Sequence, residues 1–186
     1  MALNVAGLQA QILQILSTPI GKTTPAQAAA EWTAAYDSYA RAGTDASLDP
    51  VLSVKPPAFR AALKFVNRSG TPLTAALEFE RAFIGYWTGG LFAVGLPPTP
   101  AVIPPSAPPV AWQNEIVSVV IAAVPGLASL LVPIFTDNAN QDLNSRARQF
   151  ANAFHTATTT MVTVQISGLT VPMPTPLPII HIGLVQ

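Results

Sequence analysis

The sequence predicts an α+β fold that is mainly α, with amphipathic helices, a small C-terminal β element and proline-rich extended connectors. Three observations predict it. Apolar residues recur at steps of three and four over most of the chain, which is helical spacing. β-branched residues alternate at period two after the last long helix, which is strand spacing. The chain has nineteen prolines, about twice the usual share of roughly 5%, and eleven of them lie in two stretches, 97–109 and 172–178, that suit neither a helix nor a central strand.

These patterns divide one folding unit into four parts. Residues 1–96 form an N-terminal helical part, and residues 97–110 form a proline-rich connector. Residues 111–167 form a central unit in which a helix leads directly into a strand. Residues 168–186 form an extended C-terminal arm. A chain of 186 residues suits a single domain with such an arm.

Four helices are expected in the N-terminal part, and three of them have a start signal in the sequence. A first helix is expected from Met1 to Leu16. Thr24 followed by Pro25 and Gln27 is a capping-box pattern, and it predicts a second helix that ends at Gly43. The third helix is expected to begin at the Pro56-Pro57 pair and end at Gly70, and the fourth to begin with Thr71 as N-cap and Pro72 at the first helical position. In the second helix we expect an aromatic core stripe of Trp32, Tyr36 and Tyr39. In the fourth we expect an apolar face of Leu73, Leu77, Ile84 and Trp87.

The third helix is expected to bury Phe59, Leu63 and Val66 and to turn Arg60, Lys64 and Arg68 outward. These three basic residues form the one positive stripe that the sequence predicts. Solvent exposure is the favoured interpretation of the stripe, and contact with an acidic neighbour is the second.

The longest apolar run, Ile116 to Phe135, has two interpretations. Twenty residues without a charge are long enough to cross a bilayer. However, Pro125-Gly126 interrupts the run at its centre, Pro133 interrupts it again near its end, and its flanks lack an excess of basic residues. We therefore favour two short buried segments, Trp112 to Val124 and Leu127 to Phe135, that meet at a Pro-Gly corner.

A helix of about six turns is expected next, with Asp137 as its N-cap. Its apolar face is spaced at three and four residues and consists of Leu143, Ala147, Phe150, Phe154, Ala157 and Met161. Val162, Val164 and Ile166 then alternate with polar residues, which predicts a half-buried strand that Gly168 ends. A second strand is expected from Ile179 to Val185. It could pair with residues 160–167 of the same chain or add to the sheet of a neighbouring copy.

Composition limits the classes of function. Charged residues make up 10% of the chain, against about 25% in a typical soluble domain, so we expect partners to cover much of the surface. Nine basic and nine acidic residues cancel without a basic cluster, so nucleic-acid binding is not expected. The chain has no cysteine, which excludes disulfides and thiolate chemistry.

No catalytic, cofactor-binding or metal-binding residue is assigned, and the chain is not expected to be an enzyme. Two histidines are present, and His155, beside the apolar face of its helix, is expected to be structural. The segment from Asp137 to Asp142 resembles a calcium loop only distantly, because it lacks the glycine and the distal glutamate. The closest carboxylate pairs are Asp45 with Asp49 and Glu78 with Glu80. Residues two apart on a helix diverge, and loop acids at such spacing are common.

Two runs resemble small virion proteins of tailed bacteriophages. Residues 29–40, AAEWTAAYDSYA, are similar to the alanine-rich first part of such proteins, and residues 150–164, FANAFHTATTTMVTV, are similar to their helix-into-strand second part. The resemblance implies a neck, head–tail joining or tail-end component, in a ring or a few copies, and it implies no catalytic residues.

The expected function is therefore structural: a virion protein, assembled in the host cytoplasm, that packs against other copies of itself and other virion proteins in a homo-oligomeric ring. The expected contacts lie on the connector and the C-terminal arm, through Pro104, Pro105, Ile179, Ile180, Ile182 and Leu184. The alternative is a small membrane-active protein, holin-like or pore-forming, that uses Phe83–Leu96 and Ile116–Phe135.

Overall fold

The chain is mainly helical and adds a small β element, which confirms the predicted fold class. The computed structural model describes residues 3–19, 22–44, 51–64, 70–92, 113–137, 142–171 and 178–185. The helices in these residues are α1 Val5–Ser17, α2 Pro25–Ala40, α3 Pro56–Leu63, α4 Pro72–Trp87, α5 Leu127–Thr136 and α6 Leu143–Met161. The strands are β1 Val51–Ser53, β2 Leu91–Phe92, β3 Gln113–Ala123, β4 Val162–Val171 and β5 Pro178–Leu184.

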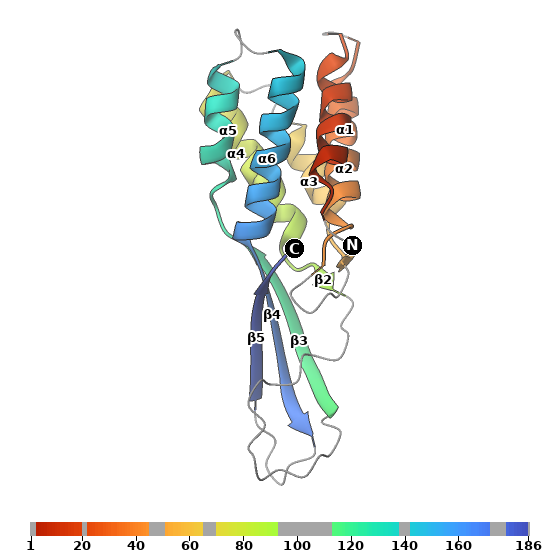
Figure 1. Ribbon diagram of the computed structural model, residues 1–186, viewed down its shortest axis with the longest axis vertical. Helices are drawn as coiled ribbons and strands as arrows, with labels where there is room; N and C mark the ends of the chain where they lie inside the picture. Colours follow the sequence, from red (N-terminus) through yellow and green to blue (C-terminus); the bar gives the residue numbers. More distant parts are fainter. Residues whose placement is uncertain are drawn as a thin grey trace.

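The helices form a bundle at one end of the molecule, and the sheet of β3, β4 and β5 projects from it as a long ribbon (Figure 1). Each helix packs against the next one along the chain, and α6 packs against α1, so the bundle closes on itself. The two ends of the chain lie close together where the bundle meets the sheet (Figure 1). A separate short antiparallel pair joins β1 to β2.

An aromatic core fills the bundle. Tyr36, from α2, stacks on Phe59 with ring centroids 5.2 Å apart and meets Phe154 at 5.1 Å. Trp32 is half-buried and packs edge-on against Phe79 and Phe150 at 5.2 and 5.3 Å. Such aromatic pairs contribute about 0.5–1.5 kcal/mol each beyond the area they bury. The predicted stripe of Trp32, Tyr36 and Tyr39 therefore faces the core, as expected.

Local capping signals start most helices where the sequence predicts. Thr24 and Gln27 form the reciprocal capping box of α2, and the Thr71 hydroxyl accepts from the Thr74 amide at the start of α4. Helix α1 begins later than predicted, at Val5, because the Asn4 side chain accepts from the Gly7 amide and caps it there. Helix α2 is shorter than predicted and ends at Ala40, and α3 ends at Leu63; Val66 and Arg68, expected on the third helix, lie outside the described residues.

Two expectations about the helices are wrong. Asp137 does not cap α6; Asp142 does, accepting from the Asn144 and Ser145 amides at 2.9 Å each. Leu73 and Leu77 do not face the core and are 56% and 46% exposed. The larger Phe79, Phe83 and Tyr86 side chains set the rotation of α4 instead, because burying aromatic rings removes more apolar surface from water.

The long apolar run divides at Pro125-Gly126, as favoured, into strand β3 and helix α5. Helix α5 continues past Pro133 to Thr136, so the second predicted break is wrong. Within the described parts of the chain, no helix combines the length and the apolarity needed to span a membrane.

Helix α6 ends at Met161, and β4 begins at Val162, so the predicted helix-to-strand junction is confirmed. The strand does not stop at Gly168, however, and runs to Val171. Gly168 is held in the ladder between Ile116 of β3 and Ile179 of β5, and pairing on both sides outweighs the weak strand preference of glycine.

Candidate assembly surface

The projecting sheet is antiparallel, in the order β3-β4-β5, and β4 is its central strand. Ten residues of β4 at about 3.3 Å per residue make the ribbon roughly 30 Å long. The helices meet it at one end, where the Val124 amide donates to the Met161 carbonyl at 3.0 Å. Among the described strands, β3 and β5 each have one hydrogen-bonded neighbour, so each presents a free edge.

The C-terminal strand pairs within its own chain, which decides between the two pairings that the sequence left open. Its register with β4 runs without a shift from Leu184 opposite Thr163 to Pro178 opposite Leu169. Four of the residues predicted to make assembly contacts are brought together on this one strand: Ile179, Ile180, Ile182 and Leu184. The other two, Pro104 and Pro105, lie outside the described residues.

The register also assigns the β5 residues to faces of the sheet. Ile180, Ile182 and Leu184 lie opposite Ser167, Gln165 and Thr163 of β4. Directly paired residues share a face, and successive residues alternate between faces. The register therefore places Ile180, Ile182 and Leu184 at positions that share one face of the sheet with Ser167, Gln165 and Thr163.

The two free edges differ in their protection against pairing with another chain. Natural edge strands are blunted by charges, prolines and bulges. β3 has a register shift between Ile116 and Ser118 and an acidic residue, Glu115. After Pro178, β5 has neither a register shift nor a charged residue other than the titratable His181. Of the two edges, β5 is the less protected.

The end of the arm is fixed to the bundle. Val185 is 1% exposed and belongs to the hydrophobic core. It lies beside Gly43, where an added Cβ would come within 3.1 Å of a Val185 methyl and 3.0 Å of a Leu3 methyl. The absence of a side chain at Gly43 thus lets both ends of the chain pack against the turn after α2.

Three of the titratable groups that the sequence singled out, His155, Glu78 and Glu80, have structural partners, whereas Asp45 and Asp49 lie outside the described residues. The Nδ1 atom of His155 is 2.7 Å from the Tyr39 hydroxyl, so this histidine is held in a structural hydrogen bond. Glu78 pairs with Arg81, whereas Glu80 accepts from the Gly126 and Ala128 amides at 2.6 and 3.0 Å. Among the described residues, no three histidine or acidic side chains gather in a way that could hold a metal ion.

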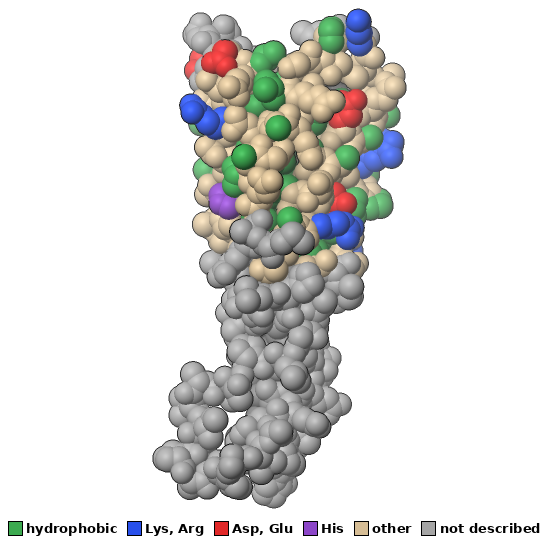
Figure 2. Space-filling model, turned by 45° about the vertical axis from the view of Figure 1, so that its right-hand side comes forward, with side chains coloured by type: hydrophobic (Ala, Val, Ile, Leu, Met, Phe, Trp, Pro, Cys, Tyr) green, Lys and Arg blue, Asp and Glu red, His purple; other side chains and the backbone are tan. Residues whose placement is uncertain are grey.

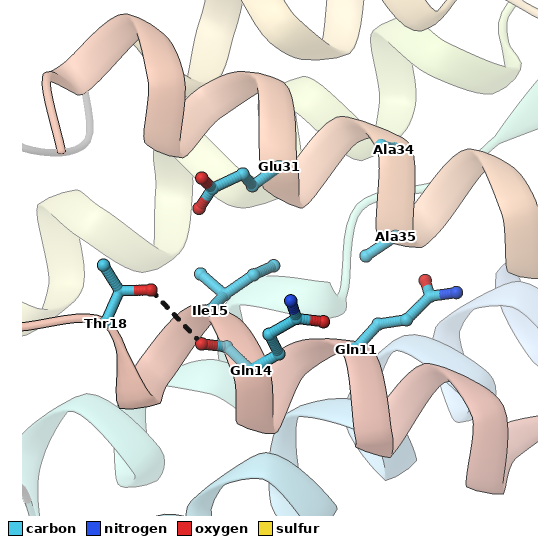
Figure 3. A pocket seen from close by; sticks show the side chains of 7 residues that line it. All are labelled: Gln11, Gln14, Ile15, Thr18, Glu31, Ala34 and Ala35. Carbon is cyan, nitrogen blue, oxygen red and sulfur yellow. Dashed lines mark hydrogen bonds between the residues drawn. The ribbon is translucent and has the colours of Figure 1, made fainter.

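A groove between α1 and α2 was not predicted. It holds about 380 Å³ and is lined by Gln11, Gln14, Ile15, Thr18, Glu31, Ala34 and Ala35. Figure 3 shows the Glu31 carboxylate extending into the space between the two helices, above Ile15. The small side chains of α2 on this side are a signal that was present in the sequence, but nothing local showed which helix they face.

Charged side chains are scattered over the helical body, with acidic and basic groups intermixed (Figure 2). Comparisons with models of protein families, with curated proteins and with solved structures found no match.

Proposed function

We propose that the chain is a structural component of a tailed-phage virion, at the neck or the tail end, where neighbouring subunits cover its projecting sheet. The observation that carries the proposal is the free edge of β5, which has no register shift and no Asp, Glu, Lys or Arg, on a ribbon that extends away from the helical bundle. The backbone groups of a free sheet edge are stabilised when another chain adds to that edge and pairs with them.

The composition supports the same conclusion. With 10% charged residues the chain has little to hydrate a large surface, and a long ribbon raises the ratio of surface to volume. Contact with other copies and other virion proteins would remove apolar surface from water at about 25 cal/mol per Å². The similarity of residues 29–40 and 150–164 to small virion proteins is the reason for choosing a phage particle over another assembly.

In this proposal the C-terminal arm binds a neighbouring subunit by strand pairing at the β5 edge, and it is not a flexible linker. Because β5 is already paired to β4 and Val185 is packed in the core, joining a neighbour requires no new ordering of the strand. Preorganisation of this kind lowers the entropy cost of association.

The test is to look for the chain in tailed particles made from the genome that encodes it. Mass spectrometry of purified particles should find it in a fixed number of copies, and disrupting its gene should give separate heads and tails or shortened tail ends in electron micrographs. Absence from the particles would overturn the proposal. Recovery in a carbonate-resistant membrane fraction would instead favour the membrane-active alternative.

A further inference from the structure

The groove between α1 and α2 has the chemistry of a binding surface for a cationic helix. Gln11 and Gln14 form one wall, Glu31 stands on the other, and Ile15 and Ala35 line it between them (Figure 3). A second hollow of about 170 Å³ shares Gln11 and continues along the same two helices past Gly7 and Ser38. The groove therefore extends along both helices and is longer than a pocket for one side chain.

Glu31 is exposed and forms no ion pair with any residue that the structure describes. Two other acidic residues of the bundle are used differently, since Asp37 pairs with Arg41 and Glu80 accepts from two backbone amides. A free carboxylate beside amide groups and an apolar floor suits an occupant that combines small apolar residues with a cation.

Helix α3 presents such a surface on its outer side. Pro57, Arg60, Ala61 and Lys64 are all exposed and recur at helical spacing, with Phe59 and Leu63 buried behind them. Neither Arg60 nor Lys64 pairs with an acidic group among the described residues. This is the described part of the basic stripe that the sequence predicted.

The stripe cannot enter the groove of its own chain. Helix α3 packs against α2 through its buried side, where Phe59 stacks on Tyr36, and the stripe lies on its exposed side, away from this contact. A second copy has no such restriction.

We propose that the α1–α2 groove binds the exposed α3 stripe of a second copy, with Arg60 or Lys64 facing Glu31. The groove and the stripe are different surfaces, so each copy offers both halves of the contact. A contact of this kind repeats from copy to copy and produces a ring if the rotation closes and a filament if it does not. The interface is independent of the β5 edge and goes beyond the function proposed above.

The experiment is a charge exchange in the full chain, measured by sedimentation velocity over a range of protein concentrations. Glu31→Lys alone, and Arg60→Glu with Lys64→Glu in one chain, should each weaken self-association about tenfold or more, because each places like charges together. An equimolar mixture of the two variants should restore association, since every groove then meets a stripe of opposite charge. The matched control is Arg148→Glu, which reverses another exposed basic residue and should leave association unchanged.

The mixture separates the interface from damage to the fold, because unfolded chains would not rescue one another. The proposal is overturned if the wild-type chain does not self-associate, if neither variant weakens association, or if both do so without rescue in the mixture. The proposal would also be overturned if the wild type bound a small organic cation, Glu31→Lys did not, and both self-associated equally. The groove would then have another occupant. Each of these results leaves the test of the chain in virions standing.

Discussion

At the scale of single residues, the bundle core depends on a chain of buried hydrogen bonds around Tyr36. The Trp87 indole N–H donates to the Tyr36 oxygen at 2.8 Å, and the Tyr36 hydroxyl lies 2.8 Å from the Thr158 hydroxyl. Thr158 in turn donates to the Phe154 carbonyl at 2.7 Å. All the donors in this series of hydrogen bonds have an acceptor only if the Tyr36 hydroxyl donates to the Thr158 oxygen. Helices α2, α4 and α6 are thereby joined through one phenol.

Tyr36→Phe should lower the free energy of unfolding by about 2 kcal/mol, because it leaves the buried indole N–H of Trp87 without an acceptor. The matched control is Tyr86→Phe, which removes a hydrogen bond to Asp37 while Arg41 still pairs with that carboxylate. Its cost should be about 1.5 kcal/mol, at the low end of the range for a hydrogen bond to a charged group. Chemical denaturation followed by helical circular dichroism measures both. A smaller loss for Tyr36→Phe than for Tyr86→Phe would contradict the assignment.

The three tyrosines of the chain also predict how stability depends on pH. Burial raises the pKa of Tyr36, Tyr39 and Tyr86 above the ordinary value of 10.0, and the hydrogen-bonded Asp37 carboxylate raises that of Tyr86 further. The folded state thus keeps protons that the unfolded chain releases. This contribution to stability is complete below pH 10.0 and is lost as the pH rises above it.

We expect denaturation midpoints to fall steeply above that pH, with tyrosinate absorbance appearing together with loss of the helical signal. Absorbance and circular dichroism recorded during one alkaline titration make the comparison. If tyrosinate appeared while the helices were intact, the tyrosines would be accessible and the expectation wrong.

At the scale of elements, α5 depends on a cap from a distant part of the chain. Its N-cap position is Gly126, which has no side chain to cap with, and Glu80 of α4 accepts from the Gly126 and Ala128 amides instead. The negative carboxylate also lies at the positive end of the helix dipole. This contact fixes α5 against α4 directly after β3, and so it orients the helix that follows the first strand of the sheet.

Glu80→Ala should therefore destabilise the fold by about 2 kcal/mol, in the range of a lost helix cap and of hydrogen bonds to a charged group. Glu78→Ala is the matched control. It removes only an ion pair with Arg81, whose side chain is 74% exposed, so its cost should stay below about 0.5 kcal/mol. Thermal unfolding of the two variants side by side distinguishes them, and equal costs would mean that the Glu80 contacts add nothing.

Elements were predictable from the sequence where the signal is local. Thr24 and Thr71 are caps followed by proline, and the change from helical to strand spacing at Met161 needs only neighbouring residues. The start of α6 was misplaced because the segment offers two aspartates that could cap, and packing selects Asp142. β3 was not identified as a strand because a short apolar run without alternation fits a buried helix equally well. Glu80 could not be identified as a cap, because 46 residues separate it from Gly126.

At the scale of the whole molecule, the sequence predicted which residues would occupy the arm but not where the arm would lie. The strand of residues 178–184 is recognisable by its composition, whereas its pairing with β4 depends on contacts between distant segments. The groove shared by α1 and α2 is likewise a product of packing. Both candidate surfaces are therefore properties of the packed chain rather than of any one segment.

Pairing of β5 with another chain can be tested with two neighbouring proline substitutions, Ile180→Pro and His181→Pro. Successive residues of an antiparallel strand point their backbone N–H groups to opposite sides, so one of these amides faces β4 and the other faces the free edge. Proline removes the N–H in each case. The inward substitution should cost about 3 kcal/mol or less of stability, since it breaks a ladder hydrogen bond at an edge strand. The outward one should leave the monomer stable but abolish edge pairing.

Thermal unfolding identifies which variant keeps its stability, and sedimentation of that variant then shows whether it still self-associates through the sheet. If the variant that keeps its stability still assembles like the wild type, the β5 edge is not a contact between chains. This holds whether that variant is Ile180→Pro or His181→Pro. The two substitutions fall at adjacent positions of one strand and introduce the same residue. If one lowers stability and the other lowers only assembly, the direction of the lost backbone N–H explains the difference.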